Sequence, residues 1–120
     1  MHTKLLQSTL RLILALVISL SLAGISAGEA RAATYNVTNT NDSGAGSLRA
    51  AITSANANPG EDTITFTVSG GIALSSALPA ISEDLNIDGT GQSVAINGMD
   101  AYRILYVNSG AVLSISNLAI

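Results

Sequence analysis

The chain lacks cysteine and tryptophan altogether, and charged residues make up only 11% of its 120 residues. Without cysteine it forms no disulfide bond, and thiol nucleophiles and thiolate metal ligands are excluded. The only histidine is His2 and the only lysine is Lys4. The rest of the chain therefore offers no Ser-His-Asp triad, no Schiff-base lysine and no histidine-ligated zinc. Carboxylates, hydroxyls and arginines remain, and we expect no catalytic residue, no cofactor and no metal site.

The N-terminus has the pattern of a secretory signal peptide. A basic stretch precedes an uncharged apolar run over residues 12–27, and small residues follow at Ala30 and Ala32. This order predicts a signal peptide over residues 1–32, cut before Ala33. A membrane anchor is the alternative, but the run has 16 residues and a spanning helix needs about 20. We therefore expect a secreted or cell-surface protein with no membrane span after cleavage.

Cleavage would leave 88 residues with a net charge of −5, because they contain seven acidic residues and only two basic ones, Arg49 and Arg103. Such a chain has no basic patch to neutralise phosphates, so nucleic-acid binding is not expected. The partners that fit an exported acidic chain are an extracellular polysaccharide or a host or cell-surface ligand.

Short runs of alternating apolar residues, bounded by Gly, Asn and Asp, predict strands along the exported part. These runs are TYNVT (34–38), TITFTV (63–68), LNID (85–88), SVAIN (93–97), the apolar burst RILYV (103–107) and AVLSISNLAI (111–120). In the last run the apolar positions change from odd to even numbers at Ser116-Asn117. A strand keeps its apolar side chains inward across such a slip only by bending, and asparagine tolerates the left-handed backbone of a corner.

Glycine-bearing corners recur at Asp88-Gly89 and Asn97-Gly98. Strands that turn corners around one interior predict the coils of a solenoid, and the IDG, ING and ISN recurrences are weak internal repeats. A small β-sandwich is the alternative that the same periodicity allows.

A single helix is predicted over residues 47–56. Ser47 precedes it as an N-cap, and Pro59 disfavours helical backbone just before itself. On its polar side we expect Arg49 to bind a carboxylate or a carbonyl rather than a substrate. The apolar face consists of four residues at helical spacing: Leu48, Ala51, Ile52 and Ala55.

The remaining candidates for chemistry favour structural roles. The glycines before the helix lack the third glycine and the lysine of phosphate loops, so they predict a turn. The adjacent acids Glu61-Asp62 and Glu83-Asp84 are expected to be solvated turn residues. Asp88 and Asp100 are the acids that could line a calcium or sugar groove, with Arg103 as a weak candidate base. Two tyrosines, Tyr102 beside the RILYV burst and Tyr106 within it, are expected to be mostly buried.

The stretches VTNTNDSGAGSLRAAITSANANPGEDTITF, ALPAISEDLNIDG and LSISNLAI resemble the start of secreted bacterial right-handed parallel β-helix proteins. These proteins carry an N-terminal segment named for its Cys-Ser-Leu-Arg-Glu-Ala core (CSLREA). Here the core corresponds to Gly46–Ala51, with departures at Gly46 and Ala50. The resemblance covers Tyr35 to Ile120 and implies a relation to pectin-lyase-like β-helices and to polymorphic outer-membrane or adhesin-type surface proteins.

Together these patterns predict an all-β chain that forms the first two or three coils of a right-handed parallel β-helix, with an N-terminal capping α-helix. The expected organisation is a signal peptide (1–32), a first strand and capping helix (33–62), and incomplete β-helix coils (63–120). The expected function is that of an exported structural or adhesive surface protein without catalysis, as the N-terminal piece of a longer protein, with self-association through its open C-terminal end. Alternatives are the N-terminal part of a pectin-lyase-like polysaccharide lyase or hydrolase, and a nonfunctional truncated product.

Overall fold

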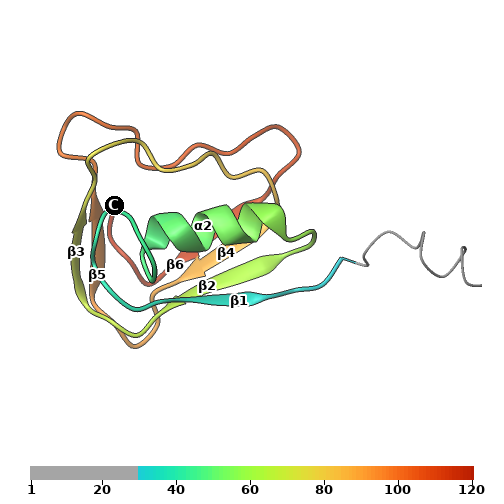
Figure 1. Cartoon of the computed structure of the whole chain (residues 1–120), viewed down its shortest axis with the longest axis horizontal. Helices are drawn as coiled ribbons and strands as arrows, with labels where there is room; N and C mark the ends of the chain where they lie inside the picture. Colours follow the sequence, from blue (N-terminus) through green and yellow to red (C-terminus); the bar gives the residue numbers. More distant parts are fainter. Residues whose placement is uncertain (1–29) are drawn as a thin grey trace, which may run out of the picture.

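The structure is a computed structural model that describes residues 30–120. Nearly all of the predicted signal peptide lies outside these residues, as does the alternative membrane anchor. In the described part, six strands and one helix follow one another along the chain (Figure 1). Their bounds are β1 Thr34–Val37, α2 Leu48–Ala57, β2 Asp62–Phe66, β3 Gly70–Ala73, β4 Leu85–Asp88, β5 Val94–Asn97 and β6 Leu113–Ser116.

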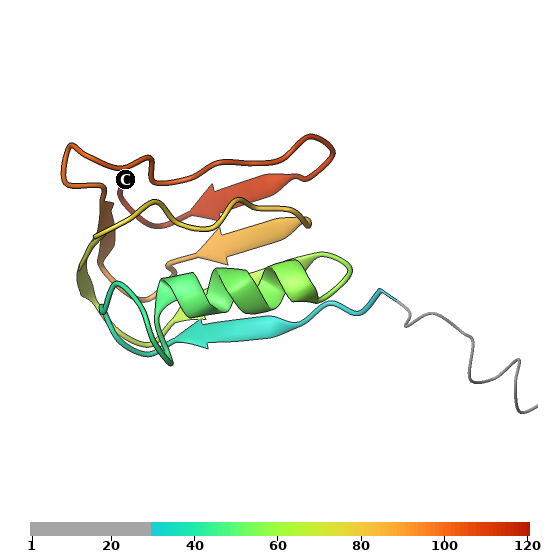
Figure 2. The same ribbon diagram turned by 45° about the horizontal axis from the view of Figure 1, so that its top comes forward.

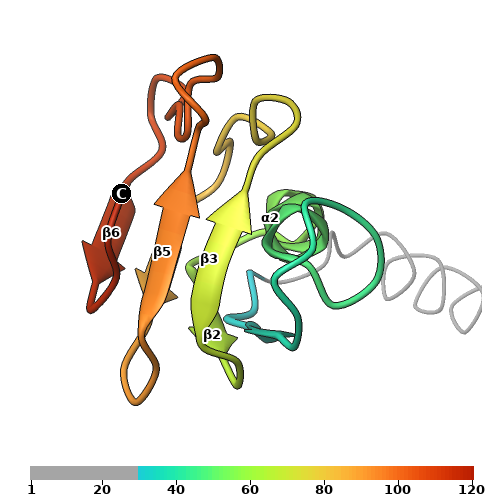
Figure 3. The ribbon, with the colours of Figure 1, turned by 90° about the vertical axis from the view of Figure 1, so that its left-hand side faces the viewer.

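All of the strand pairs are parallel, and they form two sheets. The larger sheet has the order β1-β2-β4-β6, and the smaller one pairs β3 with β5. From β2 to β6 the chain enters the two sheets alternately, so that each return places a strand beside the one from the previous pass (Figures 1 and 3). The result is a mostly β globule with one helix, built from parallel sheets.

Equivalent positions stack from pass to pass. In the larger sheet Ile64 pairs with Ile87, and Ile87 pairs with Ile115. The second sheet aligns Ile72 with Ile96. Outside the strands, isolated parallel bridges join Ile81 to Val107 and Ala95 to Ala119. At these positions each pass places an apolar residue directly over an apolar residue of the pass before it.

The helix forms as the sequence predicts, one residue later at each end. The Ser47 hydroxyl accepts a hydrogen bond from the Ala50 amide at 3.2 Å and so satisfies one of the free N–H groups of the first turn. Asn58 leaves helical geometry directly before Pro59. The four residues of the predicted apolar face are the buried ones: Leu48, Ala51, Ile52 and Ala55.

This apolar face packs on β1 and β2, at the edge of the larger sheet opposite β6 (Figure 2). The exposed side of the helix is held by Asn56, whose amide donates to the Ala80 carbonyl at 2.7 Å and accepts from the Ser82 amide at 3.0 Å. The β1 end of the stacked strands is therefore covered by α2.

The corners confirm one local prediction and refine another. Asn117 adopts a left-handed backbone with φ 57°, at the place where the apolar parity slips. Gly89 has no positive φ; glycine is required there because a Cβ would overlap the Asn117 carbonyl of the next pass. The corner at Gly98 is equally tight, since a Cβ would overlap the Tyr102 carbonyl.

Two strand predictions are wrong in detail. The burst RILYV forms no strand, and only Val107 makes a bridge there. It lacks the alternation that a strand with one buried face requires, and the chain enters it from the tight turn at Gly98. Conversely, the sequence does not predict β3, because GGIA contains a single large apolar residue, Ile72; the strand exists through its pairing with β5.

Candidate functional site

The side of the structure opposite α2 is apolar and open. Ile64 and Ile87 are fully buried, but the next residue in their column, Ile115, is 37% exposed. Ile120 is 62% exposed. We call this surface the open face; its apolar side chains, exposed or only partly buried, are Ile104, Leu105, Val107, Val112, Leu113, Ile115, Leu118 and Ile120. In a parallel stack these positions are where another layer would pack.

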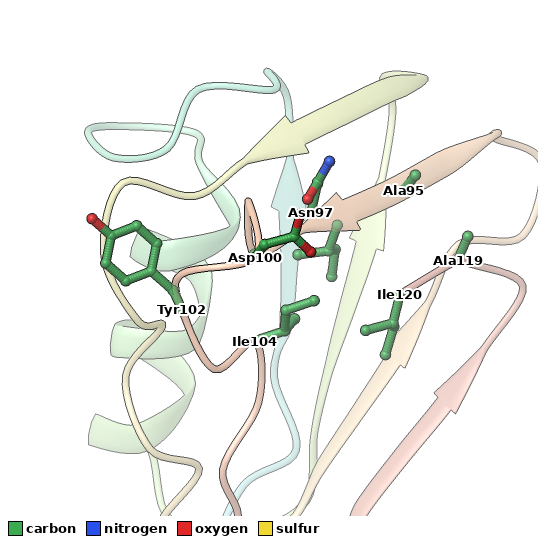
Figure 4. A pocket seen from close by; sticks show the side chains of 9 residues that line it. Ala95, Asn97, Asp100, Tyr102, Ile104, Ala119 and Ile120 are labelled. Carbon is green, nitrogen blue, oxygen red and sulfur yellow. The ribbon is translucent and has the colours of Figure 1, made fainter.

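A cavity of about 460 Å³ opens on this face, beyond the end of β5 (Figure 4). Ile104 and Ile120 form its apolar wall, and the Tyr102 hydroxyl points away from both. Asn97 and Asp100 are the polar members of the lining besides Tyr102. The cavity therefore offers one carboxylate, one amide and one phenol beside apolar surface, a set that can contact and bind a polar ligand.

The two tyrosines do not lie as the sequence predicts. Tyr102 is 42% exposed and Tyr106 is 50% exposed, so the expectation that both are mostly buried is wrong. Both lie in residues 101–106, a segment that forms no strand. The Arg103 guanidinium stacks over the Tyr106 ring at 5.0 Å from its centroid. This is the geometry of a cation–π contact.

Arg49 links the helix to two loops. Its guanidinium donates to the carbonyls of Asp42 at 3.0 Å, Ser76 at 2.9 Å and Ala77 at 2.6 Å, and to the Asp42 carboxylate at 2.9 Å. Asp42 also accepts from the Ser75 hydroxyl at 2.6 Å and the Ser75 amide at 3.0 Å. The Ser75 hydroxyl, the Ser75 amide and then Arg49 stabilise the charged form and lower the pKa of Asp42 to about 2. Both carboxylate and carbonyl contacts foreseen for Arg49 are thus made.

Asp88 organises the corner between β4 and β5. Its Oδ1 accepts from the Thr90 hydroxyl at 2.6 Å, the Thr90 amide at 2.9 Å, the Asn117 amide group at 3.0 Å and the Ser116 hydroxyl at 3.1 Å. The hydrogen bonds from Thr90 and Asn117 lower the pKa of Asp88 to about 2. Asp88 is absent from the lining of the cavity that holds Asp100, so the two acids are not brought together there.

The buried acid that sequence reasoning misses is Asp62. It is 0% exposed, whereas the preceding Glu61 is exposed, so the expectation of a solvated acid pair holds only for Glu61. Its Oδ1 accepts from the Ala33 amide at 2.8 Å and the Asn58 amide group at 2.7 Å, while its Oδ2 is buried without a partner. One signal is present in the sequence: Asp62 has the same parity as the inward residues Ile64 and Phe66.

The residues around the predicted cut lie at the beginning of the fold. Ala30 and Ala32 are exposed, and Ala33 is half-buried. The Ala33 carbonyl accepts from the Thr63 amide at 2.9 Å, directly ahead of the β1–β2 ladder. The predicted cleavage would thus leave the ladder intact.

Within residues 30–120 no helix is long and apolar enough to span a bilayer. The same residues contain no group of three or more acidic or histidine side chains placed to hold a metal ion. No protein-family model, curated protein or solved structure matches the chain.

Proposed function

We propose that this chain is the exported N-terminal part of a right-handed parallel β-helix protein with a structural or adhesive role at the cell surface. The observation that carries the proposal is the stacking of successive passes: Leu85 pairs with Asp62 on one side and with Leu113 on the other, and isoleucine lies over isoleucine in the interior. Crossovers between parallel strands of one sheet are almost always right-handed, which favours the right-handed form of the coil.

The asymmetry of the two ends supports the same proposal. A solenoid needs a cap where its strand ladder would otherwise stay open, and α2 covers β1 and β2 with an apolar face. The open face has the opposite character, with partly buried apolar side chains such as Leu113 and an unpaired edge on β6. Such a face suits further coils or a second copy of the chain.

A structural role is favoured over catalysis by how the polar groups are used. Arg49, Asp42 and Asp88 each take part in several hydrogen bonds within the fold, and Arg103 stacks on a ring. These contacts cross from one segment to another and stabilise the loops and corners. The cavity beside Asp100 and Tyr102 is open enough to contact a sugar chain, the partner class that an exported acidic protein with an exposed aromatic residue would meet.

The alternative, a pectin-lyase-like lyase or hydrolase, is separated from this proposal by an activity measurement. The exported chain is incubated with polygalacturonate and calcium while the absorbance of unsaturated product is followed. We expect no turnover. Turnover that is lost in Asp100→Asn and retained in Asp84→Asn would replace the structural proposal with an enzymatic one centred on the cavity.

The adhesive part is tested by co-sedimentation of the same chain with insoluble polysaccharides. We expect retention that falls in Tyr102→Ala, which removes an exposed ring from the cavity. Tyr106→Ala, which removes a comparably exposed ring that does not line the cavity, is the matched control and is expected to bind as the unaltered chain does. Equal retention of Tyr102→Ala would exclude the cavity as the binding site.

A further inference from the structure

We propose that cleavage between Ala32 and Ala33 creates an α-ammonium group that forms an ion pair with the buried carboxylate of Asp62, so that processing locks the first strand onto the fold. The inference rests on the export proposed above. It concerns a different question, which is what the new N-terminus does in the folded protein.

The geometry is already in place before cleavage. The Ala33 nitrogen lies 2.8 Å from Oδ1 of Asp62. The Ala33 carbonyl accepts from Thr63, so the residue is held on both sides of its Cα. Because Asp62 is 0% exposed, water does not reach the carboxylate to solvate it.

The carboxylate lacks the partner that its charge requires. Among residues 30–120 Asp62 receives two neutral donors, both at Oδ1, and Oδ2 receives none. A buried carboxylate without a countercharge and with an unsatisfied oxygen is strongly unfavourable. The missing group is thus a cation with more than one N–H, positioned where the Ala33 nitrogen is.

Hydrolysis of the Ala32–Ala33 bond supplies that group. Water adds a hydroxyl to the Ala32 carbonyl carbon and a proton to the Ala33 nitrogen, and the resulting amine takes a second proton from solvent at neutral pH. An amide with one N–H becomes an ammonium with three, so Oδ1 keeps its donor and Oδ2 can gain one. Cleavage also removes two contacts of Arg31: its amide to the Pro59 carbonyl at 3.1 Å and its carbonyl to the Asn58 amide group at 2.7 Å.

The surroundings favour a positive charge at this point. The charged residues on the neighbouring segments are Glu61 beside Asp62, and Glu83 and Asp84 directly ahead of β4; β1 carries none. Asn58 marks the C-terminal end of α2, where the helix dipole is negative and no basic residue lies in the last turn. The one nearby cation in the sequence, Arg31, leaves with the signal peptide.

The composition provides a clean probe. Lys4 is the only lysine, so the cleaved chain has a single primary amine, that of Ala33. The full chain is exported from a bacterium, and the N-terminus of the product is determined by intact mass and sequencing. Reductive methylation with formaldehyde and cyanoborohydride is then followed by mass near pH 7, since only the neutral amine reacts. Rates in guanidinium chloride give the reference for an unpaired amine.

Two variants isolate the ion pair. Asp62→Asn removes the carboxylate. A glycine inserted after Ala32 keeps Asp62 and the cut site but moves the amine away by one residue, about 3.5 Å of chain. We expect the folded product to react at least about ten-fold more slowly than the glycine variant, equivalent to one unit of pKa or more. All three forms should react alike when unfolded.

The pair also predicts a pH dependence of stability. An α-amine has an ordinary pKa near 8, and pairing raises it in the folded state. The stabilisation is therefore complete below about pH 8 and is lost as pH rises through the folded value. The melting temperature should fall between about pH 8 and 10 relative to that of the glycine variant. The three tyrosines are present in both proteins, so their contribution cancels in the difference.

The outcomes separate this inference from the export proposal. A product that starts at Ala33 but reacts as fast as the glycine variant overturns the ion pair and leaves export standing. A product that starts at another residue overturns the ion pair and also leaves export standing, whereas a product that keeps its signal peptide inside the cell overturns both. A slow amine together with the alkaline loss of stability supports the pair, and the glycine variant decides the question even if Asp62→Asn does not fold.

Discussion

The difference between the two ends of the stack predicts a graded response to one substitution. Ile64, Ile87 and Ile115 occupy paired positions on three successive strands of the larger sheet. The first two are 0% exposed and the third is 37% exposed. Replacing each by alanine removes the same atoms from three environments that differ mainly in what lies on either side.

The magnitudes follow from the burial. Isoleucine to alanine removes three carbons, a transfer loss of about 2.4 kcal/mol at 0.8 per carbon. At Ile87, which has a strand on both sides, the closed cavity left behind raises the cost to about 3–4 kcal/mol. At Ile115 only about 63% of the side chain is removed from water, and no closed cavity forms, so the cost is about 1.5 kcal/mol.

Urea unfolding of the exported chain, followed by far-ultraviolet circular dichroism at a concentration where it is monomeric, measures these differences. The free energy of unfolding of a domain of this size is only about 5–10 kcal/mol. If the alanine variants do not fold, isoleucine-to-valine replacements can be compared instead, since each costs about 0.5–1.5 kcal/mol at a buried position. An Ile115→Ala loss equal to that of Ile87→Ala would refute the reasoning, because it would mean that the third strand is covered in the monomer.

Three further predictions concern the polar links and corners. Arg49→Ala should lower the melting temperature by about 5–10 °C, because three carbonyls and the Asp42 carboxylate lose their hydrogen-bond donor. Arg49→Lys cannot donate in four directions and should recover less than half of that loss in melting temperature. Equal stability of all three forms would contradict this prediction. Because Asp42 and Asp88 have folded pKa values near 2, their contribution to stability is complete above the ordinary pKa near 4 and is lost as pH falls toward 2. In Asp42→Asn and Asp88→Asn, stability should therefore change less with pH in that window. Acid unfolding curves that are unchanged in these variants would exclude the two acids as the cause. Gly89→Ala should lower the free energy of unfolding in urea by about 1–3 kcal/mol, because the added methyl group overlaps the Asn117 carbonyl. Gly71→Ala is the control: its methyl group meets nothing within 4 Å, so the free energy of unfolding should change by no more than about 0.5 kcal/mol. A Gly89→Ala variant as stable as the unaltered chain would contradict the close approach.

The features that the sequence predicts well are those written in neighbouring residues. The helix follows from four apolar positions at helical spacing after Ser47, and the structure buries those four. The corner at Asn117 follows from a one-residue slip in alternation. In both cases the interactions that decide the local structure lie within a few positions along the chain.

The features that it predicts poorly depend on residues far apart in the chain. The strand β3 is defined by pairing with β5, and Asp62 is buried because Ala33, 29 positions earlier, donates to it. The two tyrosines are exposed because nothing in the described part of the chain packs over them. The spacing of residues along the sequence does not reveal this. Among the candidate site residues, the sequence names Asp100 together with Asp88, but the cavity of Asp100 with Ile104 and Ile120 arises only on folding.

The central claim is that this chain leaves the cytoplasm and acts outside it, and cell fractionation of a producing bacterium tests it most directly. The full chain is compared with Leu16→Arg, which places a charge in the apolar run of residues 12–27 and leaves the folded part unchanged. We predict that the unaltered chain is found outside the cytoplasm with Ala33 at its N-terminus, and that Leu16→Arg stays inside at full length. An unaltered chain that remains in the cytoplasm with the predicted signal peptide still attached would contradict the claim.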